Sequence, residues 1–400
     1  MTLTEAMLLE DIRQQLFSPT ESATPLAVGA ELELIPVDVR TKSVVPAQGG
    51  ARSSARVIAA LATREGWKEE ENGDDPPSWK LPDGARLSFE PGGQIEISSS
   101  PHPTASSLIY SLQRVATQLE EEMSAEGIEL VARGVDPYND IAAVPLQLRR
   151  DRYTRMTDYF NSIGPSGIRM MRQTAALQIN VERGSEPLLR WRLLNAIAPL
   201  VIALFANSRW YDGSDTGFAS YRAQLWRTLD DSRTGLAYDE KDPAAHYLSF
   251  ALNAVAIRSN EREPAQYTSF REWMRTSDLT IDDWHFHLST LFPEVRPKAY
   301  FELRSADTID IRSLTAPIVF VTGLIYDPDT SRRVIALLGA PSPELIERGG
   351  RLGLADPDLR RLIGKTIEQS LRGAHALGPG YLTSGHVANA QEHFARALDG

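Results

Sequence analysis

Four segments of this 400-residue chain alternate apolar and polar residues with a period of two. They lie at residues 31–34, 94–98, 177–181 and 298–304, and most of their polar positions hold acids, amides or cationic residues. Side chains two apart on a strand point to the same face, so each segment predicts a strand with one apolar and one polar face. If the four strands share one sheet, its apolar face packs on helices and its polar face lines an open cup.

Carboxylates gather on the polar face of this predicted sheet. Residues two apart on a strand lie about 7 Å apart, so Glu31 and Glu33 can reach two neighbouring cations, or one cation and its water. So many carboxylates on one face repel one another unless cations neutralise them. Oxygen-only ligation suits Mg²⁺ or Mn²⁺. The predicted metal ligands are Glu31, Glu33, Glu90, Glu96 and Glu302.

A Pro-Gly-Gly break separates two strand-like pieces within residues 89–98. Glycine allows another group to approach the backbone closely, and we expect that group to be a ligand. A single Glu-x-Glu segment is more often a solvated strand face than a binding site. The agreement of four segments favours a cation site over a solvated sheet.

Composition and charge exclude several classes of function. The net charge is −11, from 42 basic and 53 acidic residues, which argues against nucleic acid and anionic membranes as partners. The absence of cysteine excludes disulfides, thiolate catalysis and cysteine-ligated zinc. Residues 1–17 read as an amphipathic helix with acids rather than a signal peptide. The longest apolar run, 193–206, is too short to span a membrane, so we expect a cytoplasmic protein.

The order of the predicted elements favours an α+β fold, with most strands in the first third of the chain and helices later. We expect strands at 26–37, 86–90, 94–98, 128–133, 170–182 and 298–304, and the longest helices at 104–126 and 186–208. Residues 69–82 are acidic and rich in proline and glycine, which predicts a surface loop. We expect a catalytic domain at 1–330 and a C-terminal helical segment, 331–400, packed on the same domain.

Seven motif pieces occur in order along the chain. They are GAELE at 29–33, FEPGGQIEIS at 89–98, RY through YF at 152–160, MRQT through QIN at 171–180, YR through W at 221–226, HLSTLFP at 287–293 and YFELR at 300–304. Together they resemble the glutamate–cysteine ligases of the plant and bacterial type, within the glutamine synthetase/guanidino kinase-like carboxylate–amine ligases. The resemblance covers residues 28–326 and implies an antiparallel-rich curved sheet that forms an open cup, with helices covering its apolar face.

The chemistry implied by this resemblance is an ATP-dependent ligation. ATP phosphorylates the γ-carboxylate of glutamate, and the amine of cysteine attacks the acyl phosphate to give γ-glutamylcysteine, ADP and phosphate. The partners are then small molecules (glutamate, cysteine and ATP with Mg²⁺), and the product serves either glutathione or ergothioneine synthesis. Oligomeric state is not predicted.

The resemblance also implies roles for individual residues. Arg222 would grip the glutamate substrate, and Trp226 would wall its pocket. Lys298 and Arg304 would face the phosphates and, with Glu96, form the catalytic set. Further contacts to glutamate or phosphate are expected from Arg152, Arg172, Thr174, Gln178 and Asn180.

Two other functions stay open at this point. The chain could be a γ-glutamyl ligase for another amine, or a catalytically silent regulator that binds nucleotide. One segment departs from the family: residues 303–307 read Leu-Arg-Ser-Ala-Asp where plant-type members have Arg-Gly-Ala-Asp. This difference raises a question about the local backbone rather than about the chemistry.

Overall fold

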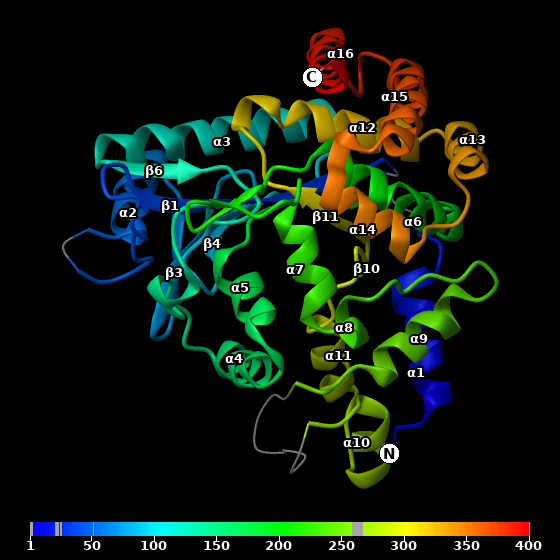
Figure 1. Ribbon diagram of the computed structural model, residues 1–400, viewed down its shortest axis with the longest axis horizontal. Helices are drawn as coiled ribbons and strands as arrows, with labels where there is room; N and C mark the ends of the chain where they lie inside the picture. Colours follow the sequence, from blue (N-terminus) through cyan, green and yellow to red (C-terminus); the bar gives the residue numbers. More distant parts are fainter. Residues whose placement is uncertain (1–2, 21–23, 25, 51, 258–266, 400) are drawn as a thin grey trace.

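The computed structural model describes residues 3–20, 24, 26–50, 52–257 and 267–399, and a nine-stranded antiparallel sheet lies at its centre (Figure 1). In spatial order the main path is β10 (Val295–Pro297), β11 (Phe301–Asp307), β7 (Ala176–Val181), β1 (Val28–Asp38), β5 (Ile95–Ser98), β4 (Arg86–Phe89), β3 (Asp75–Lys80) and β2 (Lys68–Asn72). The ninth strand, β6 (Ile128–Val131), pairs with the C-terminal part of β1. The mixed, antiparallel-rich architecture confirms the predicted fold class.

The register brings the four alternating segments side by side. Glu33 lies opposite Glu96 across β1 and β5, and Glu31 lies opposite Gln178 across β1 and β7. Glu302 on β11 lies opposite Asn180. The prediction that these segments share one sheet is therefore confirmed.

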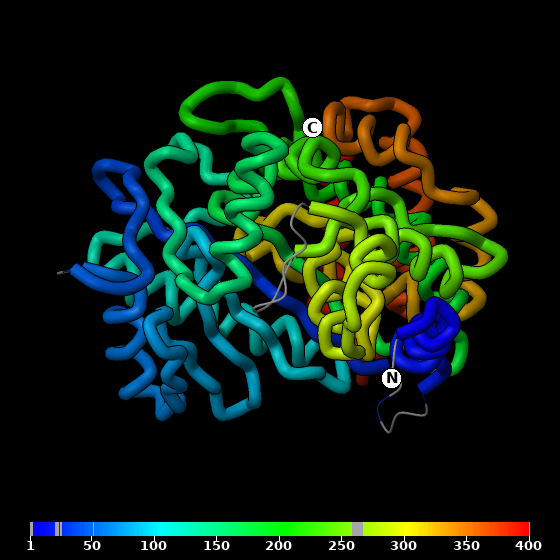
Figure 2. The backbone as a smooth tube through the Cα atoms, turned by 90° about the horizontal axis from the view of Figure 1, so that it is seen from below, coloured from blue at the N-terminus to red at the C-terminus, as the bar shows by residue number. Residues whose placement is uncertain are grey.

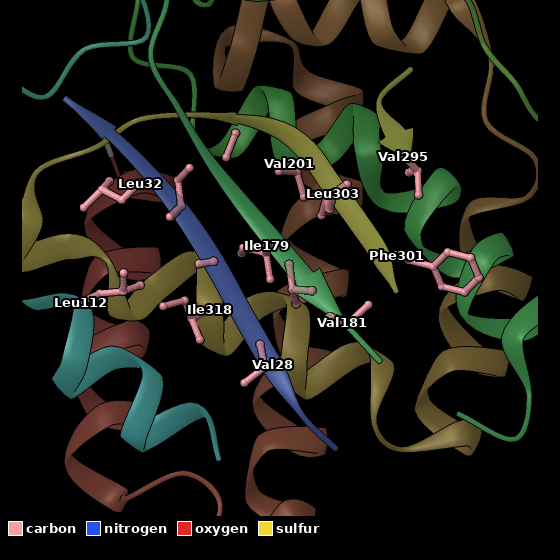
Figure 3. Close-up of a cluster of buried hydrophobic side chains, with 14 of the residues drawn as sticks. Val28, Leu32, Leu112, Ile179, Val181, Val201, Val295, Phe301, Leu303 and Ile318 are labelled. Atoms are coloured by element: carbon pink, nitrogen blue, oxygen red, sulfur yellow. The ribbon is translucent and has the colours of Figure 1, made fainter. Parts of the chain in front are cut away.

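Helices cover the apolar face of the sheet. They are α3 (Ala105–Ala125), α6 (Pro187–Leu204) and α12 (Thr315–Ile325). Strand residues such as Leu32 and Leu303 pack towards Ile318 of α12 and Val201 of α6 (Figure 3). Among the described residues, α6 is the one helix long and apolar enough to cross a membrane by length and composition, and 78% of it is buried inside the molecule. Its apolar surface therefore belongs to the core.

The other face of the sheet is walled by helices from the middle of the chain. Seen from below, β1 runs diagonally behind two groups of these helices (Figure 2). One group is α4 (Asp151–Ile163) and α5 (Pro165–Gln173), and the other is α9 (Pro243–Asn253), α10 (Phe270–Thr276) and α11 (Ile281–Ser289). Helix α7 (Tyr221–Leu229) packs against α5. These helices close the cup around the polar face.

Shorter elements complete the first part of the fold. They are α1 (Glu5–Ile12), a π-helical turn (Arg13–Phe17), α2 (Ser54–Glu65), α8 (Asp231–Thr234) and the hairpin β8 (Trp210–Tyr211) and β9 (Ser214–Asp215).

Four helices follow at the C-terminal end and pack mainly on α6 and α12. They are α13 (Pro328–Leu338), α14 (Pro343–Leu352), α15 (Pro357–Leu377) and α16 (Ser384–Asp399). The division between residues 330 and 331 stays a prediction, and α13 runs through it.

Three predicted elements are wrong in part. The segment predicted as a strand at 298–304 starts with a bend at 298–300, and its strand, β11, runs from Phe301 to Asp307. Residues 69–82 do not form a surface loop but the hairpin β2–β3, because Trp79 is fully buried and its ring packs edge-on against Phe89 at 6.3 Å. The acidic, proline-containing composition of the segment gave no indication that this one side chain is buried and anchors the hairpin. Residues 170–173 belong to α5 rather than to a strand, because Pro165 opens a helix whose Met170 and Met171 pack inwards. The strand begins only at Ala176.

Candidate active site

A cavity of about 460 Å³ opens on the polar face of the sheet, between α4, α5, α7 and α11. Most of the predicted site residues line it: Glu31, Glu33, Glu90, Glu96, Arg152, Thr174, Gln178, Arg222, Trp226, Lys298 and Arg304. Three predicted residues are not among the lining side chains: Arg172, Asn180 and Glu302. The structure therefore gathers acids and cations from Glu31 to Arg304 into one cavity.

The acidic wall is held in place by hydrogen bonds from neighbouring strands. The two carboxylate oxygens of Glu33 accept from Gln178 Nε2 and from the Ala176 amide, both at 2.8 Å. Ser98 donates to Glu96 Oε1 at 2.6 Å. Period-two alternation explains this arrangement, since it places all these polar groups on the face away from the helical core.

Burial and mutual repulsion raise the pKa values of these acids. Burial, followed by the charges of Glu96 and Glu302, raises the pKa of Glu31 to about 7. Burial is also the main cause that raises the pKa values of Glu33, Glu90 and Glu96, and a neighbouring carboxylate adds to it in each case. Such a cluster gains stability from protons or from a cation.

The donor set of the acidic wall fits a hard divalent cation, because it offers only oxygen atoms. Among the residues that the structure describes, however, no three acid or histidine side chains converge closely enough to hold a metal ion as they stand. The metal role of Glu31, Glu33, Glu90, Glu96 and Glu302 therefore stays a prediction.

Glu302 forms ion pairs with three cationic side chains. Its oxygens accept from Arg296 at 2.7 and 3.0 Å, from Lys298 at 2.5 Å and from Arg304 at 2.7 Å. Burial would raise the pKa of Glu302, but the charges of Arg296, Arg304 and Lys298 outweigh it and hold that pKa below its ordinary range. The contacts that the structure gives Glu302 thus fix the orientation of three cationic side chains.

Arg222 lines the cavity with part of its guanidinium unused. Its Nη2 donates to the carbonyl of Arg304 at 2.8 Å, and the group lies 4.4 Å from the centre of the Trp226 ring. The buried Nε has no hydrogen-bond partner among the described residues. A stacked, buried guanidinium with spare N–H groups is suited to a planar carboxylate.

Arg152 and Arg304 present further unused donors. Arg304 Nη1 donates to Gln178 and Glu302, and Arg152 Nη2 donates to the Ser289 carbonyl at 2.8 Å. The Nε of each is buried with no partner in the described part of the chain. Arg172 instead donates to Thr157 at 3.5 Å, away from the cavity lining.

Thr174 and Asn180 each donate a hydrogen bond to a neighbouring residue of the protein. The Thr174 hydroxyl donates to the carbonyl of Met170 at 2.6 Å, and Asn180 Nδ2 donates to Glu31 at 3.5 Å. Thr174 still lines the cavity, whereas Asn180 is not among the lining residues.

The two glycines of the Pro-Gly-Gly turn approach the protein itself. A Cβ atom on Gly92 would lie 1.9 Å from the Arg172 carbonyl oxygen, and one on Gly93 would lie 2.4 Å from Gln147 Nε2. Gly93 also has a φ of +91°. Gln94 fixes the turn by donating to the Thr174 carbonyl at 2.8 Å. Contacts within the protein explain both glycines, so the expected close approach of a ligand is not needed to account for them.

Sequence reasoning missed two features of the cavity. One is Arg296, whose pairing with Glu302 depends on the short strand β10 inside a proline-containing segment. The other is an apolar wall of Met156, Met170, Met171 and Phe292 around Trp226. The helical spacing of Met156 and Phe160 could have indicated part of this wall.

Comparison with known proteins agrees with the geometry. The model of glutamate–cysteine ligase family 2 matches residues 27–343. The chain is 31% identical over 362 residues to the chloroplastic glutamate–cysteine ligase of Brassica juncea, covering 85% of this chain and 68% of the relative. It is 32% identical over 301 residues to the glutamate–cysteine ligase EgtA of Mycolicibacterium smegmatis, covering 72% of this chain and 70% of the relative.

A solved structure shares the fold at low sequence identity. The glutamate–cysteine ligase of Francisella tularensis, in complex with AMP, superposes with a TM-score of 0.52 at 10% identity. The superposition covers 96% of this chain and 83% of that one.

Proposed function

Because this chain belongs to glutamate–cysteine ligase family 2, we propose that it joins the γ-carboxylate of glutamate to the amine of cysteine at the expense of ATP. The products are γ-glutamylcysteine, ADP and phosphate. The observation that carries the proposal is the cavity on the polar face, which both acidic and cationic side chains line. We also propose a cytoplasmic protein whose partners are small molecules.

Each wall of the cavity has a role in this reaction. Phosphoryl transfer depends on positioning and charge neutralisation rather than on covalent help from the protein. Mg²⁺, or Mn²⁺ in its place, would be held by Glu31, Glu33, Glu90 and Glu96, and when bound it neutralises phosphate charge. Glu302 is a fifth candidate, which can reach a cation only if Lys298 or Arg296 releases it.

The cationic side chains bind the substrates. Arg222 holds a carboxylate of glutamate through its spare N–H groups, above the ring of Trp226. Lys298 and Arg304 stabilise the charge that develops as the phosphoryl group moves to the γ-carboxylate. Arg152, Thr174 and Gln178 supply further polar groups to the cavity, and Arg172 and Asn180 support it from outside its lining. The amine of cysteine then attacks the acyl carbon, and phosphate leaves.

ADP release tests the proposal directly. We expect release that requires glutamate and cysteine together with ATP and Mg²⁺, and that stops when either amino acid is omitted. No release above the rate without amino acids would refute the proposal. A screen of amines in place of cysteine separates a cysteine ligase from a γ-glutamyl ligase for another acceptor. Binding of Mg²⁺·ATP without any turnover would indicate a silent regulator.

A substitution at the acidic wall tests the metal role. We expect Glu96→Gln to lose most activity, by about a hundredfold or more, because a neutral amide cannot replace a carboxylate ligand. The urea midpoint should not fall, since the amide keeps the shape and removes repulsion. Glu70→Gln, on the outer hairpin strand β2, is the matched control and should retain normal turnover. Near-normal turnover in Glu96→Gln would count against the metal role.

A further inference from the structure

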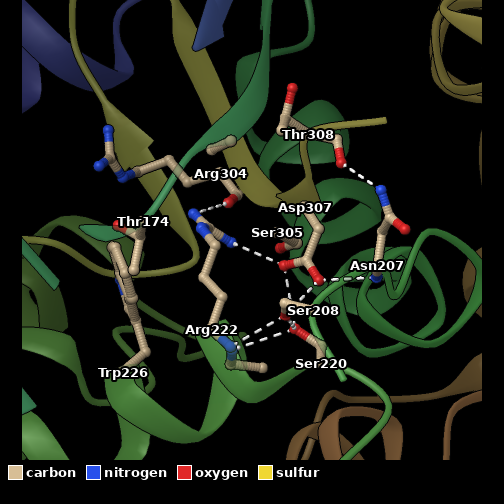
Figure 4. Close-up of polar contacts among 12 residues, drawn as sticks. Thr174, Asn207, Ser208, Ser220, Arg222, Trp226, Arg304, Ser305, Asp307 and Thr308 are labelled. Atoms are coloured by element: carbon tan, nitrogen blue, oxygen red, sulfur yellow. Dashed lines mark hydrogen bonds and ion pairs between the residues drawn. The ribbon is translucent and has the colours of Figure 1, made fainter. Parts of the chain in front are cut away.

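Asp307, the last residue of β11, carries an acid that the proposed reaction does not use. Its side chain is fully enclosed, and it accepts three hydrogen bonds (Figure 4). The donors are the backbone amide of Asn207 at 2.8 Å, the Ser208 hydroxyl at 2.7 Å and the Ser220 hydroxyl at 3.0 Å. Ser220 is also the N-cap of α7, the helix that carries Arg222. The acid is therefore built into the start of that helix.

Arg222 is tied to Asp307 at both ends of its side chain. At the backbone, the Arg222 amide donates to the Ser208 hydroxyl at 3.1 Å, and the same hydroxyl donates to Asp307. At the guanidinium, Nη1 lies 3.9 Å from Asp307 Oδ1 (Figure 4). That distance is too long for a hydrogen bond. The acid thus attracts the guanidinium without occupying its donors, which stay available to a ligand.

An irregularity in β11 brings the parts of this arrangement together. The pairing of β11 with β7 shifts register between Leu303 and Ala306. Such irregularities bend a strand locally and change the direction in which its groups point. Here the Arg304 carbonyl and the Asp307 carboxylate both meet the guanidinium of Arg222.

The space around Asp307 is also fixed from the opposite side. A Cβ atom on Gly134 would lie 2.3 Å from Asp307 Cγ. Gly134 has no positive φ that would otherwise explain the absence of a side chain. The carboxylate is therefore confined between Gly134, the two serines and Arg222.

We infer that Asp307 is a positioning residue that holds Arg222 in the orientation that binds the carboxylate of glutamate. The inference rests on the proposed function, because it takes Arg222 as the arginine that binds glutamate. Asp307 does not touch the substrate. It acts through Arg222 in two ways. The Ser208 hydroxyl links it to the Arg222 backbone amide, and its charge attracts the guanidinium.

Steady-state kinetics of the full chain test this inference. Asp307→Asn keeps the shape of the side chain and removes its charge. We expect the KM for glutamate to rise about tenfold or more, while the KM for ATP stays within about twofold. In an Arg222→Lys background the same substitution should change the KM for glutamate by less than about threefold, because residues that act together are not additive.

The matched control is Asp356→Asn, which affects another enclosed acid paired with an arginine. Asp356 accepts from Arg348 at 2.7 and 2.8 Å, away from the cavity lining. It should leave the KM for glutamate within about twofold of the wild-type value. If Asp307→Asn does not fold, Ser208→Ala is the milder variant, and a rise of about threefold is expected.

Three outcomes would contradict the inference. The first is an unchanged KM for glutamate in folded Asp307→Asn or, failing that, in Ser208→Ala. The second is an equal fold-change in the wild-type and Arg222→Lys backgrounds. The third is equal loss for glutamate and ATP, which a merely structural role predicts. Absence of ADP release by the wild-type chain is a different failure, since it would overturn the proposed function and remove the premise of this inference.

Discussion

A close backbone contact fixes the position of the Pro-Gly-Gly turn that follows Glu90. The backbone of Gly92 touches the carbonyl of Arg172 so closely that no side chain fits between them. Overpacking a buried position forces backbone shifts that typically cost about 1–3 kcal/mol. We expect Gly92→Ala to lower the free energy of unfolding by about 2 kcal/mol and to reduce turnover, because Glu90 precedes the same turn. Urea denaturation and ADP release measure the two effects.

Gly380→Ala is the control for this substitution. A Cβ atom there meets nothing within 4 Å, and the residue has no positive φ. Its free energy of unfolding should stay within about 0.5 kcal/mol of the wild-type value. A Gly92→Ala protein as stable as this control would show that α5 can move away from the turn.

The sequence predicts site residues well where the residue pattern within one strand decides which face a side chain occupies. Glu31, Glu33 and Glu96 follow from alternation alone, because period two decides which face they occupy. Arg296 and Asp307 could not be predicted in this way. Their roles depend on a cross-strand pairing and on a register shift, and both are properties of two strands together.

The hairpin β2–β3 shows how one buried ring organises an otherwise acidic segment. Trp79 is fully buried, and Asp75 at the start of β3 bonds to Arg149 and Arg150, just before α4. We expect Trp79→Ala to lower the free energy of unfolding by about 3–5 kcal/mol, because it leaves a large cavity. Since α4 carries Arg152, the hairpin also steadies one wall of the active site. Urea denaturation checks the expected loss.

Trp210→Ala is the matched control on another short hairpin. Trp210 is 51% exposed, so its removal should cost less than about 1 kcal/mol. Equal losses for the two tryptophans would contradict the anchoring role of Trp79.

The hairpin β2–β3 could not be predicted from composition. The charged residues and prolines of the segment reflect its solvent-exposed face, whereas one buried side chain, Trp79, anchors it to the sheet. Long periodic helices such as α3 were predictable because many residues repeat the same signal.

The charge distribution of the molecule links its stability to pH. The folded-state pKa of Glu31 is about 7, above its ordinary value of 4.5. The folded protein therefore keeps a proton that the unfolded chain releases between these values, and this stabilisation, complete below 4.5, is lost as pH rises through 7. In EDTA, we expect the urea midpoint of the wild-type chain to fall more between pH 5.5 and pH 8 than that of Glu31→Gln.

The comparison of variants cancels the titrating groups that Glu31 does not affect, and it also includes the rise that the charge of Glu31 causes in the pKa of Glu33. Burial lowers the pKa of His287 to about 3, which works in the opposite direction, but His287 is present in both proteins. Glu129→Gln, which removes an acid from β6, should keep the wild-type pH dependence. Identical pH dependence in wild type and Glu31→Gln would contradict the raised pKa.

Saturating Mg²⁺·ATP should raise the urea midpoint of the wild type at pH 8 by preferential binding to the folded state.

The direct pairing of Glu33 with Glu96 across β1 and β5 has a consequence for protein engineering. Like charges opposite each other weaken a sheet, so replacing either acid with a neutral residue should make the free protein more heat-tolerant. Stabilising substitutions are generally easy to find, and their recurrent cost is activity. A laboratory selection for heat tolerance without a demand for turnover would therefore favour changes at this pair. Libraries intended to yield a robust biocatalyst should hold both positions constant and seek stability in the helices behind the sheet.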